Sequence, residues 1–167
     1  MTSQISKKIY KKLQKRYSRR INLDLSRIKK VLQKLDSPHK QLDNIINVIG
    51  SDGKNSFLTS LKYFLEADKR KVNTFTSPHL YDVRHRFWLG NRFISAIEIK
   101  KFVKFIEKTK VKLTLFELLT CIYVLSAKNT ELDSFNLIES GLFFRKDSTN
   151  LWENPMAQVI TNINYQH

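Results

Sequence analysis

The stretch that decides the fold reads Ile45-Ile46-Asn47-Val48-Ile49-Gly50-Ser51-Asp52-Gly53-Lys54-Asn55-Ser56. Its apolar first half predicts a buried strand, and the helical pattern after Ser56 predicts a helix, so a glycine-containing loop connects the two. Glycines let backbone N–H groups turn inward, a helix N-terminus adds positive potential, and Lys54 supplies a charge for the β- and γ-phosphates. We therefore expect a phosphate loop (P-loop) at residues 50–56, with Ser56 facing a phosphate-bound magnesium ion.

The spacing of this loop differs from the common pattern, because two residues separate Gly50 from Gly53 where four usually separate the glycines. The alternative is an ordinary turn in which Asp52 adopts unusual dihedral angles and Lys54 is solvated. The loop alone leaves both interpretations open, and other segments must decide between them.

The composition is that of one globular domain, with 167 residues of which 41% are hydrophobic. There is no run of about 18 uncharged apolar residues and no signal-peptide pattern at the start, so we expect a cytoplasmic protein without membrane contact. Cys121 is the only cysteine, which excludes an internal disulfide and a thiolate zinc cluster. Its apolar neighbours predict that it is buried.

The positive charge is concentrated near the start of the chain. The net charge is +15, and residues 1–40 contain 13 lysines and arginines against two acidic residues. We divide the chain into a basic helix or tail at residues 1–20 and one domain at 21–167. The basic segment 7–20 could bind RNA or polyphosphate, and a basic RNA-binding module is one alternative function. We prefer a solvated helix without a nucleic-acid partner, because no recognisable nucleic-acid-binding fold accompanies the charge.

The periodicity predicts strands and helices in alternation. We expect helices at residues 21–35, 57–67, 95–106 and 114–128, strands at 45–49, 71–75, 135–138 and 157–161, and an extended arm at 84–89. This order predicts an α/β fold with three layers, in which helices cover both faces of a mostly parallel sheet.

Polar side chains follow several of these strands. Ser77 comes after the second strand and Glu139 after the third, while Gly53 and Lys54 follow the first. In parallel sheets ligands bind at the carboxyl ends of the strands, so these residues could hold phosphate and magnesium together. Taken singly, Ser77 could be a turn residue and Glu139 a surface carboxylate.

Five blocks resemble, in this order, the folylpolyglutamate synthase/dihydrofolate synthase family of Mur-ligase-like ATP-dependent amide ligases. They are Gly50-x-x-Gly53-Lys54-x-Ser56, Thr76-Ser77-Pro78-His79-Leu80, Phe116-Glu117-x-Leu119-Thr120, Glu139-x-Gly141-Leu142-x-x-Arg145-x-Asp147-x-Thr149-Asn150 and Val159-Ile160-Thr161-x-Ile163-x-x-His167. The resemblance runs from about Ile21 to the last residue. It implies an incomplete central domain of the Mur-ligase type.

The resemblance also implies the chemistry and the cofactors, ATP and Mg²⁺. ATP phosphorylates a carboxyl group of folate or dihydropteroate, and the amine of L-glutamate attacks the acyl phosphate. By the same resemblance Lys54 and His167 are catalytic, and the magnesium ligands are Ser77, Glu139 and His167. The resemblance also implies that the nucleotide is bound by the loop amides of Gly50, Ser51, Asp52, Gly53, Lys54, Asn55 and Ser56. It implies that the folate site is bordered by Ser77, Pro78, His79, Phe116 and Thr120.

The chain departs from the family pattern at several positions. Asn55 replaces a glycine, which would cost about 1 kcal/mol if this residue needed a positive φ. Phe143-Phe144 replaces a glycine pair, and Asn164-Tyr165-Gln166 precedes His167. The family continues into a segment with a modified lysine and a C-terminal ligase domain, both absent from these 167 residues. The chain is therefore interpreted as an N-terminal fragment, with a split enzyme completed by a companion chain, or an inactive remnant, as alternatives.

Overall fold

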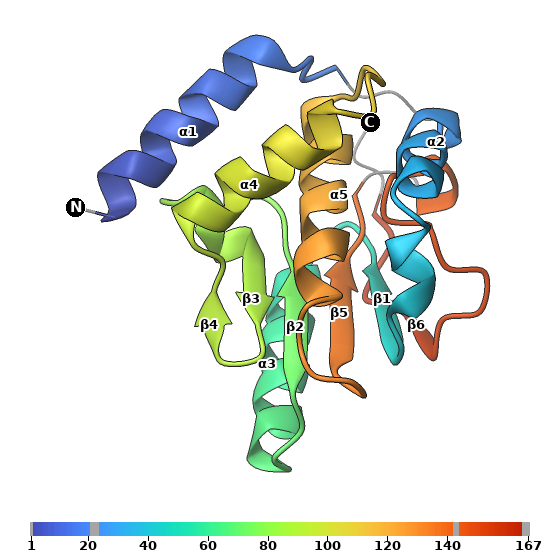
Figure 1. Ribbon diagram of the computed structural model, residues 1–167. Helices are drawn as coiled ribbons and strands as arrows, with labels where there is room; N and C mark the ends of the chain where they lie inside the picture. Colours follow the sequence, from blue (N-terminus) through green and yellow to red (C-terminus); the bar gives the residue numbers. More distant parts are fainter. Residues whose placement is uncertain (1, 21–23, 142–143, 165–167) are drawn as a thin grey trace.

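The computed structural model describes residues 2–20, 24–141 and 144–164 (Figure 1). The helices and strands are, in chain order, α1 Thr2–Arg16, α2 Ser26–Lys34, β1 Ile45–Ile49, α3 Lys54–Ala67, β2 Val72–Phe75, β3 Phe87–Leu89, β4 Arg92–Phe93, α4 Ala96–Glu107, α5 Leu115–Ala127, β5 Phe135–Glu139 and β6 Ala157–Ile160. Short 3-10 helices lie at Pro38–Gln41, Val83–Arg86 and Phe144–Lys146.

The strands form one sheet in the order β4-β3-β2-β5-β1-β6. β2, β5, β1 and β6 are parallel, whereas β3 and β4 form an antiparallel hairpin at one edge. α3 connects β1 to β2, and α4 and α5 lie between β2 and β5, whereas the segment between β5 and β6 contains only the 3-10 helix Phe144–Lys146. The prediction of an α/β fold with a mostly parallel sheet is confirmed.

Helices cover both faces of the sheet (Figure 1). Ile45 of β1 belongs to a large core that includes residues of α1, α2, α4 and α5. The next residue, Ile46, belongs to a smaller core with Val48, Leu58 and Leu137 under α3. Because successive strand residues point to opposite faces, β1 contributes to both cores, and the sheet is the middle layer of the domain.

Two N-terminal capping boxes define the starts of α4 and α5. Ser95 and Glu98 exchange side-chain and backbone hydrogen bonds at α4, and Thr114 and Glu117 do so at α5. Glu117 also accepts from Arg27 of α2 at 2.8 Å, which connects α2 to α5. Cys121 of α5 is fully buried, as expected.

The basic helix α1 packs against the domain along one side. Ile9 and Leu13 are buried in the large core. The Tyr17 hydroxyl, just after α1, donates to Glu107 Oε1 at 2.7 Å, and the Ser6 hydroxyl donates to Asp82 at 2.6 Å. The sequence pattern placed cations on every side of this helix, but the structure shows that Ile9 and Leu13 form a docked apolar side. Every helix within the described residues is too short or too polar to cross a membrane.

Two predicted segments differ from the structure. The helix expected over 21–35 begins at Ser26, because the Asp24 carboxylate accepts from the Ser26 backbone N–H at 2.9 Å and turns the chain before the helix; residues 21–23 lie outside the described part. The prediction of an extended arm over 84–89 is wrong for the first half of this range. Asp82 caps the 3-10 helix Val83–Arg86 through Arg84 N at 3.0 Å, and β3 follows.

We expect Leu58→Ala to destabilise the domain by about 2–5 kcal/mol, because Leu58 is the one fully buried residue of α3 and closes the smaller core. Urea unfolding followed by circular dichroism measures the change. Phe64→Ala is the matched control on the same helix, since that ring is 75% exposed, and it should stay within about 0.5 kcal/mol of the parent. Equal losses in the two variants would contradict the packing of α3 described above.

Candidate functional site

The loop between β1 and α3 turns under a crossing segment of chain. Gly50 has φ 142° and Gly53 has φ 77°, both in the region that favours glycine. A Cβ on Gly50 would clash with the Thr161 hydroxyl and lie 2.8 Å from the Asn162 carbonyl oxygen. Gly50 is therefore required by the close approach of residues 161–162, the segment that follows β6.

This segment fixes the first half of the loop. Ser51 N donates to Asn162 O, and Asp52 N donates to Asn162 Oδ1, both at 2.8 Å. The Thr161 hydroxyl donates to Asp52 O at 2.6 Å. The amides of Ser51 and Asp52 are thus used within the protein, so the groups that could face a phosphate belong to the second half of the loop.

That second half is the N-terminus of α3. The first helical hydrogen bond runs from Phe57 N to Gly53 O at 2.9 Å, so the N–H groups of Lys54, Asn55 and Ser56 have no acceptor within the helix. They lie at the positive end of the helix dipole, where an anion binds favourably. Asn55 and Ser56 are exposed, which leaves the helix start accessible.

Lys54 folds back over the loop. Its ammonium donates to Gly50 O at 2.5 Å and to Ser51 O at 3.0 Å. An ammonium has three protons, so one remains for a ligand after these two bonds. The amides of α3 and this charge together fit a phosphate group.

Asn55 takes an ordinary helical conformation as the second residue of α3. It is absent from the residues with positive φ in the described part of the chain, so the expected strain at this position does not occur. Its side chain instead lies beside Glu139 and lowers the pKa of that carboxyl. The replacement of glycine therefore adds a contact to the site.

Glu139 lies at the carboxyl end of β5, next to the loop, and is only 4% exposed. Its Oε2 accepts from Ser77 N at 2.8 Å, which brings the chain after β2 to the same place. Burial raises the pKa of Glu139, while the bond from Ser77 and the charge of Lys54 oppose the rise. The structure thus brings together Lys54, Ser77 and Glu139, three residues singled out from the sequence.

The residues present fit a magnesium ion carried by a nucleotide. Glu139 and the Ser77 side chain offer oxygen ligands beside the phosphate loop, and Mg²⁺ commonly uses one or two carboxylates together with phosphates and water. No group of three or more His, Cys, Asp or Glu side chains gathers within the described residues. His167, the third expected ligand, lies outside them.

The chain after β2 is anchored by a buried arginine. Arg86 is 7% exposed and its Nε donates to His79 Nδ1 at 2.8 Å. Burial, followed by the charge of Arg86, lowers the pKa of His79, which favours the neutral imidazole that this bond requires. Tyr10 of α1 packs edge-on against His79, at 4.6 Å between ring centroids. The Ser77-Pro78 peptide is cis, and Leu80 is 86% exposed.

The start of α5 meets the chain after β5. The hydroxyls of Thr120 and Ser148 are 2.9 Å apart, and the Phe116 ring stacks on Phe75 of β2. The Asp147 carboxylate accepts from the Thr149 backbone and hydroxyl, and it lies where a Cβ on Gly141 would clash with it. This folded turn explains the Asp147-x-Thr149 pattern. Residues 142–143 and the Phe144 side chain lie outside the described part, so the expected effect of Phe143-Phe144 is not located.

Three contributors to the site were missed in the sequence. The first is the contact between Asn55 and Glu139. The second is the pair of hydrogen bonds from the Ser51 and Asp52 amides to Asn162, called here the Asn162 clamp. The third is the bond from Arg86 to His79. The first two join segments that are far apart in the sequence, and the third joins residues seven positions apart. None of the three has a local sequence pattern. Only the placement of residues 159–163 in one of the five blocks pointed toward the clamp.

Comparison with known proteins relates the chain to one group of enzymes. It is 33% identical over 156 residues to a dihydrofolate synthase/folylpolyglutamate synthase of Haemophilus influenzae, covering 93% of this chain and 35% of the relative. A Mycobacterium tuberculosis folylpolyglutamate synthase complexed with ADP superposes with a TM-score of 0.84 at 25% identity, over 98% of this chain and 38% of that structure. A bifunctional folylpolyglutamate synthase/dihydrofolate synthase with Mn, AMPPNP and L-glutamate bound gives 0.77 at 29% identity, over 84% and 34%.

No protein-family profile matches the chain. The chain spans about a third of the length of the curated relatives it matches. The agreement nevertheless extends over most of this chain in both sequence and fold, including the elements that carry Lys54, Ser77 and Glu139. The chain is thus a homologue of the folylpolyglutamate synthase/dihydrofolate synthase family and corresponds to about a third of its members' length.

Proposed function

We propose that this chain forms the nucleotide-binding part of an ATP-dependent amide ligase that joins L-glutamate to folate or dihydropteroate through an acyl phosphate. The observation that carries the proposal is the meeting of Lys54, the start of α3, and the Ser77–Glu139 pair at the carboxyl ends of three parallel strands. The ADP, AMPPNP, Mn and L-glutamate bound by the similar structures support it. In this proposal residues 21–167 are the N-terminal part of the ATP-binding domain.

The phosphate chain of ATP would lie across the start of α3. The N–H groups of Lys54, Asn55 and Ser56 would donate to phosphate oxygens, and the third proton of the Lys54 ammonium would meet the β- or γ-phosphate. The bonds from Lys54 to Gly50 O and Ser51 O hold the charge in place before the ligand arrives. The residues would thus screen phosphate charge and orient the transferred group.

Glu139 and Ser77 would hold Mg²⁺ beside the phosphates, with His167 as a further ligand implied by the family resemblance. The ion neutralises phosphate charge when bound. A cation next to Glu139 favours the ionised carboxylate, so it would offset the burial that raises the pKa of this group. Metal and nucleotide binding should therefore support each other.

The substrate would border the same end of β2. Phe75 ends this strand, its ring stacks on Phe116, and the chain continues directly into Ser77, Pro78 and His79. Thr120 lies one turn after Phe116 and donates to its carbonyl oxygen at 3.0 Å. Phe75 and Thr120 are buried, whereas Phe116 is partly exposed, so the Phe116 ring is the aromatic surface that the flat ring of a pteridine could meet.

A companion polypeptide is a second proposal, favoured by the surface around β6 and α3. β6 is an edge strand of the sheet, and Ile160 is 60% exposed. Phe64 and Tyr63 of α3 are 75% and 63% exposed on the face that α3 covers. An open edge beside exposed apolar side chains is suited to pairing with further chain, so a split enzyme would be completed here. An inactive remnant would keep this surface but fail to bind nucleotide.

Lys54→Ala should weaken binding of MgATP by about 10- to 100-fold, because charged hydrogen bonds contribute about 1.5–3 kcal/mol. Isothermal titration calorimetry on the whole chain measures the affinity. Lys12→Ala removes the same charge from the exposed side of α1 and should bind like the parent. Equal affinities of the Lys54 variant and the parent would show that the loop does not contribute to MgATP binding. Absence of binding by the parent would favour the interpretation of the chain as an inactive remnant.

Glu139→Gln should abolish the increase in ATP affinity that Mg²⁺ produces. In the parent this increase should decline as the pH falls through the pKa of Glu139, which burial places above the usual value, because the protonated acid no longer attracts the cation. Ionisation of a buried acid with a raised pKa opposes folding above that pKa, so the variant should remain as stable as the parent at pH 7.

Calorimetric titrations with and without Mg²⁺ between pH 4.5 and 8 test this expectation. The exposed Glu153→Gln is the control with the same change of charge. A Mg²⁺ effect in Glu139→Gln that matches the control at every pH would show that Glu139 does not hold the ion.

A further inference from the structure

A groove lies between the C-terminal half of α4 and the C-terminal end of α5, on the face of the sheet opposite α3. The groove has a volume of about 480 Å³. It is lined by Lys101, Phe102, Lys104, Phe105, Lys108, Leu125, Lys128 and Asn129.

The floor of the groove is apolar. Phe102 is 9% exposed and Leu125 is 7% exposed, and both belong to the large core. Phe105 is 45% exposed, so a large part of its ring faces solvent. Covering this ring would remove apolar surface from water, which stabilises a complex.

The rim of the groove consists of four lysines. Lys101 and Lys104 are exposed on α4, Lys108 is exposed directly after α4, and Lys128 is exposed directly after α5. None of the four forms an ion pair within the described residues. The lining contains no acidic side chain, so the groove has a local charge of +4 that its own residues do not balance.

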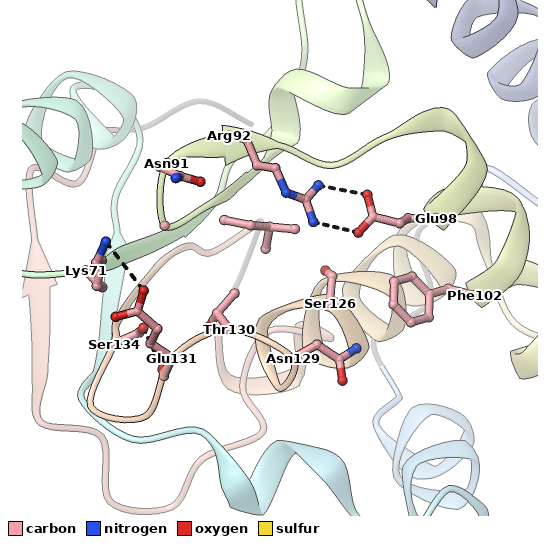
Figure 2. Close-up of a pocket in the computed structure, with 12 residues that line it drawn as sticks. Lys71, Asn91, Arg92, Glu98, Phe102, Ser126, Asn129, Thr130, Glu131 and Ser134 are labelled. Carbon is pink, nitrogen blue, oxygen red and sulfur yellow. Dashed lines mark hydrogen bonds and ion pairs between the residues drawn. The ribbon is translucent and has the colours of Figure 1, made fainter.

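The two acidic residues of α4 are already engaged elsewhere. Glu107 pairs with Arg16 at 2.8 Å, and Glu98 pairs with Arg92 at 2.8 Å. Figure 2 shows the second pair on an adjacent hollow of about 240 Å³, where Lys71 also pairs with Glu131. This hollow shares Phe102 and Asn129 with the groove. The charged side chains that line the hollow pair with one another, so of these two sites the groove is the one with unbalanced positive charge.

We propose that this groove docks an acidic amphipathic helix of a partner polypeptide. Lys101, Lys104 and Lys108 are spaced i, i+3 and i+7, so they form a row of about 10 Å along one side of α4. An amphipathic helix can place apolar side chains on Phe105 and Leu125 while its carboxylates meet the lysines on the rim. Charge and apolar surface are both complementary to such a helix, and a polyanion without apolar groups would use only the rim.

A defined probe tests the proposal. A fluorescein-labelled peptide of about 14 residues, with leucines at i, i+3, i+4 and i+7 and glutamates between them, spans ~21 Å when helical. Fluorescence anisotropy with the full chain should show saturable binding. Lys104→Ser combined with Lys108→Ser should weaken it about tenfold, and Phe105→Ser should weaken it by a similar factor.

Matched controls separate the groove from general attraction to positive charge. Lys8→Ser combined with Lys11→Ser removes the same charge from exposed positions of α1 and should change the affinity less than about threefold. A probe with serines in place of leucines should bind about tenfold more weakly. Circular dichroism and the urea midpoint show whether each variant is folded.

Several results would overturn the proposal. Absence of saturable binding would do so, as would equal losses in the groove and α1 variants. A single-stranded RNA oligonucleotide of equal charge that binds as tightly as the peptide, and depends on Lys104 and Lys108 but not on Phe105, would show a general polyanion surface instead.

Discussion

Parallel pairing of β6 with β1 is the contact on which the candidate site depends. It carries Thr161 and Asn162 across the phosphate loop, where Gly50 leaves just enough room for them. Their bonds to Ser51 and Asp52 fix the first half of the loop and thereby position the start of α3. The sheet thus contributes to assembling the site, since it brings residues 161–162 to the loop.

The charges around the loop are arranged for a ligand more than for stability. Three N–H groups at the start of α3 lack helical acceptors, and the Lys54 ammonium is held by two carbonyl oxygens. Glu139 is buried beside them, and its raised pKa reflects the cost of its charge there. A phosphate with its cation would relieve both conditions at once, because the phosphate accepts the free protons and the cation offsets the carboxylate. Such local cost is common where structure serves binding.

Local patterns explain what could be predicted from the sequence. The apolar run of β1 matched its observed bounds, and the helices expected from residues 95 and 114 begin directly after these residues, at Ala96 and Leu115, because these signals lie within a few neighbouring residues. Ser77 and Glu139 could be placed together because all parallel strands end on one edge. The Asn162 clamp joins Asn162 to Asp52, which is 110 residues away in the sequence, so it had no local signal. The docking of α1 depends on tertiary packing and had no local signal either. The positive φ considered for Asn55 does not occur, because α3 begins one residue before it, at Lys54, and Asn55 is helical.

The phosphate loop and the α4–α5 groove have different electrostatic characters, and this separates binding of a nucleotide from binding of a partner. At the carboxyl ends the single charge of Lys54 lies next to Glu139, so affinity for an anion there depends on geometry and on the free N–H groups of α3. At the groove the four rim lysines have no acidic neighbour in the lining, so attraction there depends on charge and falls with ionic strength. A partner on the α4–α5 groove would leave the phosphate loop accessible, since the loop leads into α3, which covers the opposite face of the sheet.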